Sequence, residues 1–342
     1  MNSSIGPLGV RTLGRSPSEV ALDLALRHAT YLIFLAVILY FGVQSPVFLG
    51  PESLGNVVKQ ASFIGIAAIG MTFVLLTGGI DLSVGSVMYL APLIAGLAME
   101  AFGLGVPAGL VVAVCAGAVM GAINALFIVR FNVIPFIVTL ATLFLFRGFG
   151  TWLTSSRQFD FAPEMRAFGQ SSVLGIPTPI LVFAGVALCA HVVLSRTPFG
   201  RRIYALGNDA EGARKAGVRV GLVKGSVYVV SSASAALAGF VLIAQIGRLD
   251  AAFGEGREFD VIAAAVLGGA SLFGGVGSAW GAVIGATLIQ TVKLGLVFTG
   301  VNLYLQPILQ GLIIFAAVLA DSLRQRRIAL ARRRHIRPLG PD

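Results

Sequence analysis

Asp81 stands out among the side chains that could do chemistry, because its neighbours along the chain are apolar. Burying a carboxylate in apolar surroundings is costly, so such a residue is a candidate for a functional site. Asp81 also comes just before an expected helix start at Ser83, where an aspartate caps free N–H groups and meets a favourable helix dipole. The cap is the favoured interpretation, and a broken helix beside a solute pathway could use both roles.

Neutral polar side chains interrupt several other apolar stretches. Their amide and hydroxyl groups offer the hydrogen bonds that an uncharged polar solute needs, although each one alone is more typical of hydrogen bonding between helices. Together they are compatible with a polar pathway for an uncharged solute. The candidate pathway residues are Asp81, Ser83, Asn124, Asn132, Thr139, Thr142 and Gln290.

Catalytic and metal-binding constellations are not expected. Cys115 and Cys189 lie inside apolar runs without metal-ligand spacing, so we interpret them as small buried hydrophobic residues. A phosphate-binding P-loop ends in Gly-Lys-Ser or Gly-Lys-Thr. None of the four lysines follows a glycine: Lys59, Lys215, Lys224 and Lys293. The chain is therefore predicted to be no enzyme, and it is expected to bind no metal or cofactor itself.

Charge-free runs indicate the elements that must position these residues. Hydrophobic residues make up 56% of the 342 positions, charged residues make up 12%, and the mean hydropathy is +0.90. Ordinary soluble domains have about 25% charged residues, so lipid must surround most of this chain. Nearly all of the nine runs can supply the roughly 20 residues that cross a bilayer core. They are residues 28–51, 61–80, 82–99, 101–129, 131–146, 167–195, 225–247, 261–292 and 294–320.

The run 261–292 is too long for one helix and carries two glycine clusters in its middle, at 268–269 and 274–277. Glycine clusters favour a break or a turn. Nine runs therefore become about ten spans. We predict an all-α polytopic helical bundle, with residues 28–323 as one membrane domain.

Positive charges predict the orientation of the bundle. Three Lys or Arg residues precede the first span, seven lie in residues 196–224 and seven lie in 324–337. The positive-inside rule places all three clusters in the cytoplasm. We therefore predict a cytoplasmic tail at 1–27, a cytoplasmic loop at 196–224 and a basic cytoplasmic tail at 324–342. The net charge of +10 is accounted for by topology and anionic lipid, so nucleic-acid binding is not expected.

Small residues recur inside the apolar runs. The spacing of Gly117 with Gly121 and of Gly281 with Gly285 is typical of close helix packing, within one chain more often than between chains. Segments 78–87 and 268–278 also resemble each other, since each places a glycine pair and a serine between apolar stretches. An inverted-topology repeat and a chance similarity of glycine-rich turns explain this equally well.

The basic loop contains a short polar motif at residues 199–218. Its Gly-Asn-Asp break at 207–209 can cap the start of a helix, and Gly217 can end that helix. A short helix at the membrane surface, which presents charges to a partner, is the physical expectation.

The same motif resembles the Glu-Ala-Ala-x-x-x-Gly coupling loop of ABC importer permeases, with Gly212 in place of an alanine. The resemblance implies that this loop docks into a separate ATPase subunit, which would use ATP and Mg. Glycine at 212 should loosen the helix by about 1 kcal/mol. The predicted ATPase-coupling residues are Gly207, Asn208, Glu211, Ala213, Arg214 and Gly217.

Three further segments extend the resemblance to the ribose- and xylose-type sugar permeases, namely 70–86, 135–148 and 258–269. The resemblance implies a bacterial inner-membrane permease that moves a pentose or related monosaccharide inward by alternating access. It further implies an external sugar-binding protein and a second permease chain, identical or homologous. The sequence does not specify the sugar.

Segment 248–260 is expected on the outside, where its acidic residues could meet a binding protein or simply be solvated. These residues are Asp250, Glu255, Glu258 and Asp260. An ion-coupled secondary transporter of a small neutral solute is the alternative function. Its usual mark is several ionisable groups at membrane depth, for which the sequence offers chiefly Asp81, Lys293 and His191.

Overall fold

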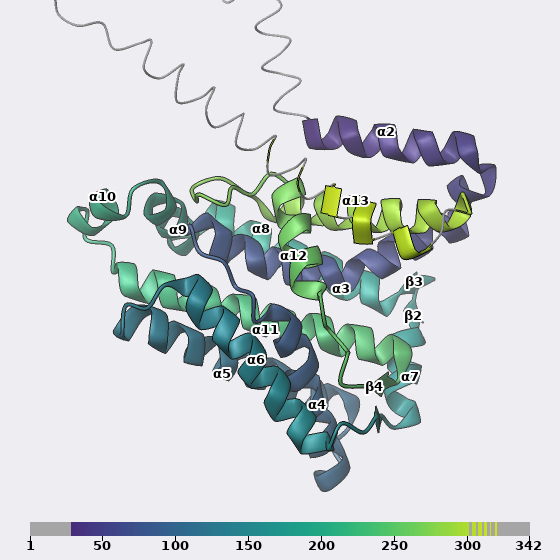
Figure 1. The fold of residues 1–342 in the computed structure, drawn as a ribbon, viewed down its shortest axis with the longest axis horizontal. Helices are drawn as coiled ribbons and strands as arrows, with labels where there is room; N and C mark the ends of the chain where they lie inside the picture. Colours follow the sequence, from purple (N-terminus) through teal and green to yellow (C-terminus); the bar gives the residue numbers. More distant parts are fainter. Residues whose placement is uncertain are drawn as a thin grey trace, which may run out of the picture.

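The computed structural model describes residues 29–300 and, beyond them, 303–305, 307–309, 311–312, 315 and 319. Both predicted tails, 1–27 and 324–342, lie outside the described residues. Helices dominate the described part (Figure 1). The helices are α2 (Ala29–Gln44), η1 (Pro46–Leu49), α3 (Pro51–Leu76), α4 (Val84–Phe102), α5 (Val106–Ala125), η2 (Leu126–Arg130), α6 (Pro135–Thr154), α7 (Pro163–Gln170), α8 (Thr178–Arg196), α9 (Pro198–Asn208), α10 (Ala210–Lys215), α11 (Val220–Ile246), α12 (Arg257–Leu267), α13 (Ala279–Phe298) and η3 (Leu303–Leu305).

Seven of the described helices are long and apolar enough to cross a membrane: α3, α4, α5 with η2, α6, α8, α11 and α13. The predicted all-α polytopic bundle is therefore confirmed. Helices α2 and α12, with 16 and 11 residues, are shorter. The count of about ten spans stays a prediction.

One predicted charge-free run ends at Val292 and the next begins at Leu294, because Lys293 is charged. This boundary between spans is wrong, because α13 continues through Lys293 to Phe298. A lysine inside the span is tolerated here because its ammonium group is paired with a carboxylate of α12. The expected run 294–320 therefore does not begin a helix of its own. Half of that run after residue 300 lies outside the described residues.

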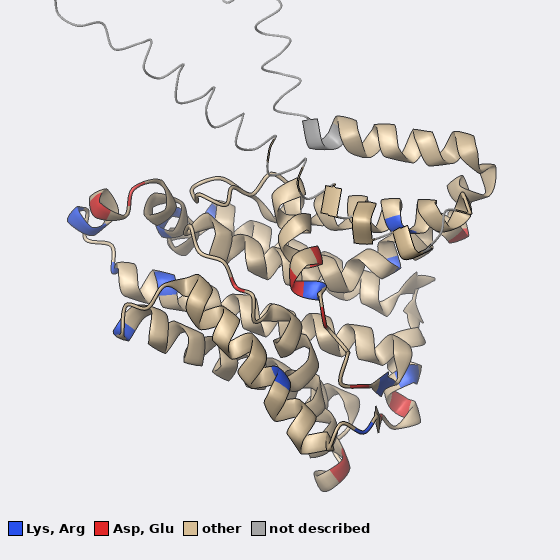
Figure 2. Ribbon diagram, in the orientation of Figure 1, with Lys and Arg blue, Asp and Glu red and all other residues tan. Residues whose placement is uncertain are grey.

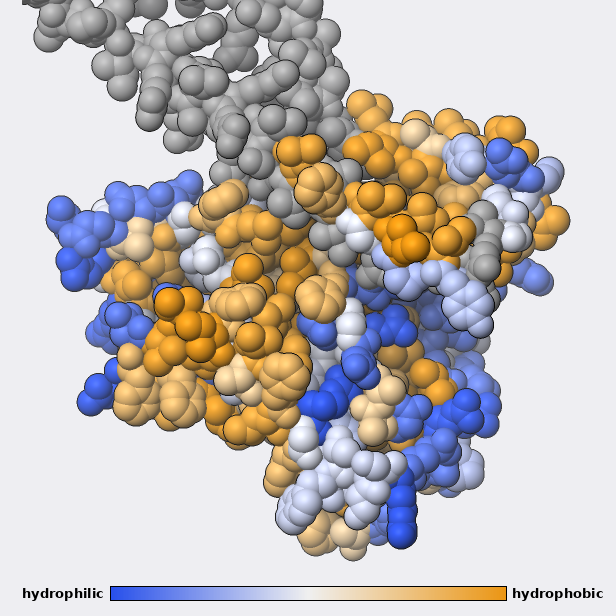
Figure 3. Space-filling view, in the orientation of Figure 1, coloured by the Kyte–Doolittle hydropathy of each residue, from blue (hydrophilic) through white to orange (hydrophobic). Residues whose placement is uncertain are grey.

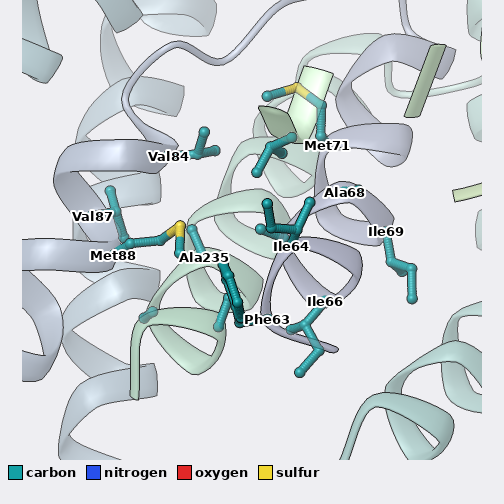
Figure 4. Packing of buried hydrophobic residues seen from close by; sticks show 14 of the residues in the cluster. Phe63, Ile64, Ile66, Ala68, Ile69, Met71, Val84, Val87, Met88 and Ala235 are labelled. Atoms are coloured by element: carbon teal, nitrogen blue, oxygen red, sulfur yellow. The ribbon is translucent and has the colours of Figure 1, made fainter. Parts of the chain in front are cut away.

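Helix α11 lies at the centre of the bundle and packs on α3, α4 and α5. Figure 4 shows the core where three helices meet: Val84 and Met88 of α4, Ile64 of α3 and Ala235 of α11. All four side chains are fully buried. Helices α3 and α11 are mostly buried, whereas α5, α6 and α8 are the most exposed of the seven long apolar helices.

Glycines allow these helices to approach closely. A side chain at Gly117 or Gly121 of α5 would press on backbone atoms of α11, and one at Gly285 of α13 would overlap the Ala264 carbonyl oxygen of α12. Such contacts bring helix backbones together in lipid. Packing within the chain, the favoured interpretation of these glycine pairs, is confirmed.

The predicted break in run 261–292 is also confirmed. Helix α12 ends at Leu267, α13 begins at Ala279, and the segment between them holds Gly269, Gly274, Gly275 and Gly277 with positive φ angles. This glycine-rich segment (268–278) contacts the other break in the bundle, segment 77–83, which separates α3 from α4. The two segments that resemble each other in sequence are thus both interruptions before a long helix, and their inverted relationship stays a prediction.

The interpretation of the cysteines as buried is wrong. Cys115 of α5 and Cys189 of α8 are both free and exposed at the surface of the chain. Because they lie on outer helices that are apolar on all sides, an exposed cysteine there faces lipid or a neighbouring chain. Helical apolar runs do not by themselves show which residues face inward.

Charged residues lie at both ends of the bundle and also in its middle, at the start of α12 (Figure 2). One end carries α9 and α10. The other carries two short antiparallel strand pairs, β1 (Phe159–Asp160) with β4 (Arg248–Leu249) and β2 (Ser172–Val173) with β3 (Ile176–Pro177). Figure 3 shows broad apolar areas between these ends, interrupted by a central hydrophilic region.

Candidate functional site

Segment 77–83 places Asp81 and Ser83 at the entrance to α4. Both residues are fully buried. The Asp81 Oδ1 atom accepts a hydrogen bond from the Ser83 backbone N–H at 3.0 Å and another from the Ser83 hydroxyl at 2.6 Å. The carboxylate therefore forms a side-chain turn with Ser83, the N-cap residue of α4. No side chain caps the N–H groups of the first turn of α4, so Asp81 holds the N-cap residue and does not cap the helix directly.

Two more of the predicted pathway residues continue this hydrogen-bond chain. The Asn124 amide of α5 donates to the Ser83 hydroxyl at 2.9 Å, and its carbonyl oxygen accepts from the Thr142 hydroxyl of α6 at 2.7 Å. Thr139, one turn before Thr142, donates to the Ile80 carbonyl at 3.2 Å. Five side chains from three elements thus form one network, which we call the polar network: Asp81, Ser83, Asn124, Thr139 and Thr142.

The structure does not bring the other two predicted pathway residues into this network. Asn132 is exposed, with φ 52°, in the turn between η2 and α6. Gln290 is buried on α13, which packs on α3, α12 and α2. The sequence shows polar residues at membrane depth but not which helix faces they occupy.

Two side chains of α11 lie beside the polar network and were missed in the sequence. Tyr228 lies against Gly79, and Ser231 lies beside the Asp81 carboxylate without completing a hydrogen bond. Ser232, next in sequence, packs toward α5. Within the described residues, Asp81 Oδ2 and the hydroxyl oxygens of these three residues are buried without a hydrogen-bond partner. A Tyr-x-x-Ser-Ser pattern inside an apolar helix is the signal that could have found them.

These unpartnered atoms give the polar network a distinctive chemistry. Buried polar groups are ordinarily hydrogen-bonded, so each exception calls for an explanation. Here hydroxyl groups and a carboxylate oxygen converge where a long helix is interrupted, and all can bind hydroxyl groups of a solute or water. The arrangement can thus exchange partners as the helices around segment 77–83 move.

The four predicted outer carboxylates are separated by the structure. Asp250 and Glu255 are exposed, whereas Glu258 and Asp260 are 7% and 3% exposed. Asp260 pairs with Lys293 of α13 at 2.7 Å and with Arg257 at 3.5 Å. Glu258 packs against Gly85 in the first turn of α4, where a negative charge is favourable. Of these four carboxylates, Asp250 and Glu255 alone can therefore contribute to an exposed acidic surface in this conformation.

Arg147 holds the segment that carries these acidic residues. Its guanidinium lies over the Tyr89 ring, 5.0 Å from the centroid, and donates to the carbonyl oxygens of Ala251 and Phe253. A cation on an aromatic face, with its donors satisfied by carbonyls, is a stable way to bury arginine in a bundle. The loop before α12 is thereby fastened to α4 and α6.

Helices α9 and α10 form a compact element at the opposite end. Asp209 caps α10, because its Oδ1 accepts from the N–H groups of Glu211 and Gly212 at 3.1 and 3.0 Å. The helix ends at Gly217, whose φ of 82° is left-handed. The Val218 N–H bonds to the Ala213 carbonyl and the Gly217 N–H to that of Arg214, which is the glycine C-cap that the sequence predicts.

The predicted coupling residues divide between two faces of this element. Glu211 and Arg214 are exposed and form an ion pair at 2.9 Å. Ala213 is buried. Gly207 and Asn208 lie at the end of α9 against the glycine-rich segment 268–278. The exposed face of α10 can thus meet a partner, whereas the end of α9 meets the rest of the bundle.

Comparisons with known proteins identify relatives over most of the chain. A protein-family model described as "Branched-chain amino acid transport system / permease component" matches residues 53–318. The chain is 38% identical to the ribose import permease protein of Bacillus subtilis over 295 residues, which is 84% of this chain and 90% of that protein. It is 36% identical to the ribose import permease protein of Escherichia coli (88% and 95% covered) and 29% identical to the xylose transport system permease protein of Escherichia coli (95% and 99% covered).

Proposed function

The chain belongs to the permease family that provides the membrane component of such transport systems, and we propose that it is the membrane-spanning subunit of an ATP-driven monosaccharide importer. The observation that carries this proposal is its similarity to ribose import permeases across 84% and 88% of its length. It is a transport subunit and not an enzyme. The family description refers to amino acids, whereas the names of these relatives refer to sugars.

The polar network supports a neutral solute rather than a charged one. Ser83, Asn124, Thr139 and Thr142 are uncharged donors and acceptors. A sugar presents hydroxyl groups that can replace such bonds one for one. An amino acid would add an ammonium and a carboxylate, which need opposite charges at membrane depth. The proposed pathway therefore runs beside Asp81 and the residues hydrogen-bonded to it.

The proposed mechanism uses the two ends of the bundle differently. The α9–α10 element lies in the cytoplasm and docks on an ATPase subunit, which binds ATP and Mg. Asp250 and Glu255 lie outside and meet a sugar-binding protein. Two permease chains, identical or homologous, surround the path in the inner membrane, with both termini in the cytoplasm. ATP-driven movement of α10 then alternates access to the polar network between the two sides.

The arrangement of the ionisable groups does not favour an ion-coupled transporter. Lys293 is engaged with Asp260, and His191 lies on α8 beside Trp280 of α13. Asp81 lies in the polar network, on a different segment from both. Proton relays bring ionisable side chains together along a path, which these three residues do not do.

Reconstitution tests the proposal directly. The chain is co-purified with its ATPase partner, placed in vesicles and supplied with its binding protein, ATP and radiolabelled ribose, xylose or leucine. We expect uptake of one sugar that requires ATP and persists when ionophores remove ion gradients. Uptake that needs an ion gradient but no ATPase would contradict the proposal, and leucine uptake would contradict the sugar. The sugar that co-purifies with the binding protein identifies the substrate.

A further inference from the structure

The end of α9 meets two interruptions of the bundle at a single point. Leu76 is the last residue of α3. A side chain at Gly207 would overlap the carbonyl oxygen of Leu76 and would also press on the backbone nitrogen of Gly275, in segment 268–278. Both obstacles are backbone atoms, so no side chain can turn away to make room. Gly207 therefore fits here because it has no side chain, which allows direct backbone contact among three segments.

Hydrogen bonds fasten the same three segments together. The Gly275 N–H donates to the Leu76 carbonyl at 2.9 Å, directly beside Gly207. The Tyr204 hydroxyl, one turn earlier on α9, donates to the Gly277 carbonyl at 2.8 Å. We call this set the α9 junction: Leu76, Tyr204, Gly207, Gly275 and Gly277.

The glycines of segment 268–278 leave little freedom for slippage in this contact. Gly274 and Gly275 both have positive φ angles, and a side chain at Gly275 would meet the Asn208 side chain. Asn208 is itself held, because its amide donates to the Tyr204 carbonyl at 2.8 Å. Interfaces with such close backbone contact move as units rather than deform gradually.

The α9 junction leads by short stretches of chain to the polar network. Segment 77–83 begins at the residue after Leu76 and carries Asp81 and Ser83. Segment 268–278 leads back to α12, whose Glu258 packs on the first turn of α4. Displacement of α9 is therefore expected to move two elements at the start of α4 together. These are segment 77–83, which leads into α4, and α12, whose Glu258 packs on the first turn of α4.

We propose that the α9 junction passes the movement of α10 to segments 77–83 and 268–278, with Tyr204 and Gly207 as positioning residues for transport. This inference rests on the proposed function, since it requires that an ATPase moves α10. It separates two roles within the coupling element. Glu211 and Arg214 face the partner, whereas Tyr204 and Gly207 engage the rest of the bundle.

The Tyr204 hydroxyl can serve in this role at any physiological pH. Burial raises the pKa of the Tyr204 side chain above its ordinary value. The hydroxyl therefore remains protonated and continues to donate to the Gly277 carbonyl. Phenylalanine at this position removes only that donor and keeps the aromatic ring in place.

Distance measurements on the complex with its ATPase test the inference. Cys115 and Cys189 are first replaced by serine. Two doubly labelled chains are then made, each with one spin label at Leu174 and the other at either Lys215 or Phe273. These three labelled positions are exposed. In the otherwise wild-type chain, ATP is expected to shift both distances to Leu174. In Tyr204→Phe, the shift at Lys215 persists while the equilibrium between the shifted and unshifted Phe273 distances falls by about 2- to 10-fold, the factor for one net hydrogen bond. Gly207→Ala is expected to lower the shifted Phe273 population as well, because its side chain would displace backbone atoms of the junction.

Gly55→Ala is the matched control, because Gly55 lies in α3 with open space around it, and it should behave as wild type. If Gly207→Ala does not assemble with the ATPase, Tyr204→Phe decides. An ATP-induced Phe273 shift in Tyr204→Phe as large as in the wild-type chain overturns the inference. The inference is also overturned if, in the wild-type chain, ATP changes the Lys215 distance but not the Phe273 distance, or changes neither. Radiolabelled sugar uptake is measured on the same preparations. A normal Phe273 shift without uptake of any sugar contradicts the proposed function alone.

Discussion

At the scale of single residues, the two oxygens of Asp81 are in different situations. Oδ1 accepts both hydrogen bonds from Ser83, and Oδ2 has no partner within the part of the chain that the structure describes. One oxygen therefore accounts for both bonds at the entrance to α4. The carboxylate also lies beside Ser231 and Tyr228 of α11, and its second oxygen is free to engage a passing hydroxyl group.

Asp81→Asn and Asp81→Ala are expected to differ. Asparagine keeps Oδ1 as an acceptor and adds an amide that can donate to Ser231, so ATP-dependent uptake should be largely retained without a new pH dependence. Alanine leaves the buried Ser83 donors without their acceptor and should lower stability by about 1–3 kcal/mol, measured as a lower melting temperature in detergent. Loss of uptake in Asp81→Asn, with normal melting and ATPase assembly, would show that the negative charge itself is required.

At the scale of elements, α10 is a short helix defined by both of its ends. Asp209 fixes its start and Gly217 fixes its end. A side chain at Gly217 would meet nothing within 4 Å, so only the backbone conformation makes glycine necessary there. Gly212 is tighter, because a side chain there would overlap the Asp209 carboxylate.

Gly217→Val should uncouple transport from ATP hydrolysis while the bundle stays folded. A β-branched residue in the left-handed region costs roughly 1–2 kcal/mol, which is enough to misplace a six-residue helix. Gly217→Asn is the control, because asparagine adopts this conformation readily. Substrate-stimulated ATPase activity and uptake in vesicles are measured for both. Wild-type values in the valine variant would mean that α10 is not the coupling element.

The ion pair between α12 and α13 leads to a different kind of prediction. Asp260→Asn leaves the Lys293 ammonium without its partner, and removing one member of a buried pair costs about 3–5 kcal/mol. The double variant Asp260→Leu with Lys293→Met removes both charges and should recover most of that loss. Thermal unfolding of the two variants checks this, and equal destabilisation in both would contradict the role of the pair.

The elements were more predictable from the sequence than the direction of their side chains. Glycine clusters predicted the break before α13, and Asp209 and Gly217 predicted the two ends of α10. Both were readable because turns and helix caps depend on residues that are close together in the sequence. The inward position of Glu258 and Asp260 could not be read, because charges near a loop are ordinarily solvated. Their burial depends on Gly85 and Lys293, which lie far away in sequence.

At the scale of the whole molecule, the two ends of the bundle differ in character. The α9–α10 end carries basic residues on exposed helices (Figure 2). The opposite end is formed by strand pairs, and its β2–β3 turn exposes Leu174 almost completely, at 98%. These features lie beyond opposite ends of α8, the helix that joins β3 to α9, so they can report the orientation of the chain.

Single-cysteine labelling in a background without Cys115 and Cys189 tests that orientation. A membrane-impermeant maleimide should label Leu174→Cys in intact cells. Lys215→Cys, in the basic loop that the positive-inside rule places in the cytoplasm, should react only after permeabilisation. Rapid labelling of Lys215→Cys from outside would reverse the orientation and remove α10 from reach of a cytoplasmic ATPase.

The central position of α11 has a consequence for biosynthesis. The chain leaves the ribosome from its N-terminus, so α3, α4 and α5 enter the membrane before the helix that fills the space between them exists. At about 5–20 residues per second, α11 follows α5 after a delay on the order of ten seconds. During that interval the glycine faces of α5, at Gly117 and Gly121, lack the helix against which they finally pack. The insertion machinery or its chaperones must shelter three finished helices until the fourth completes their core.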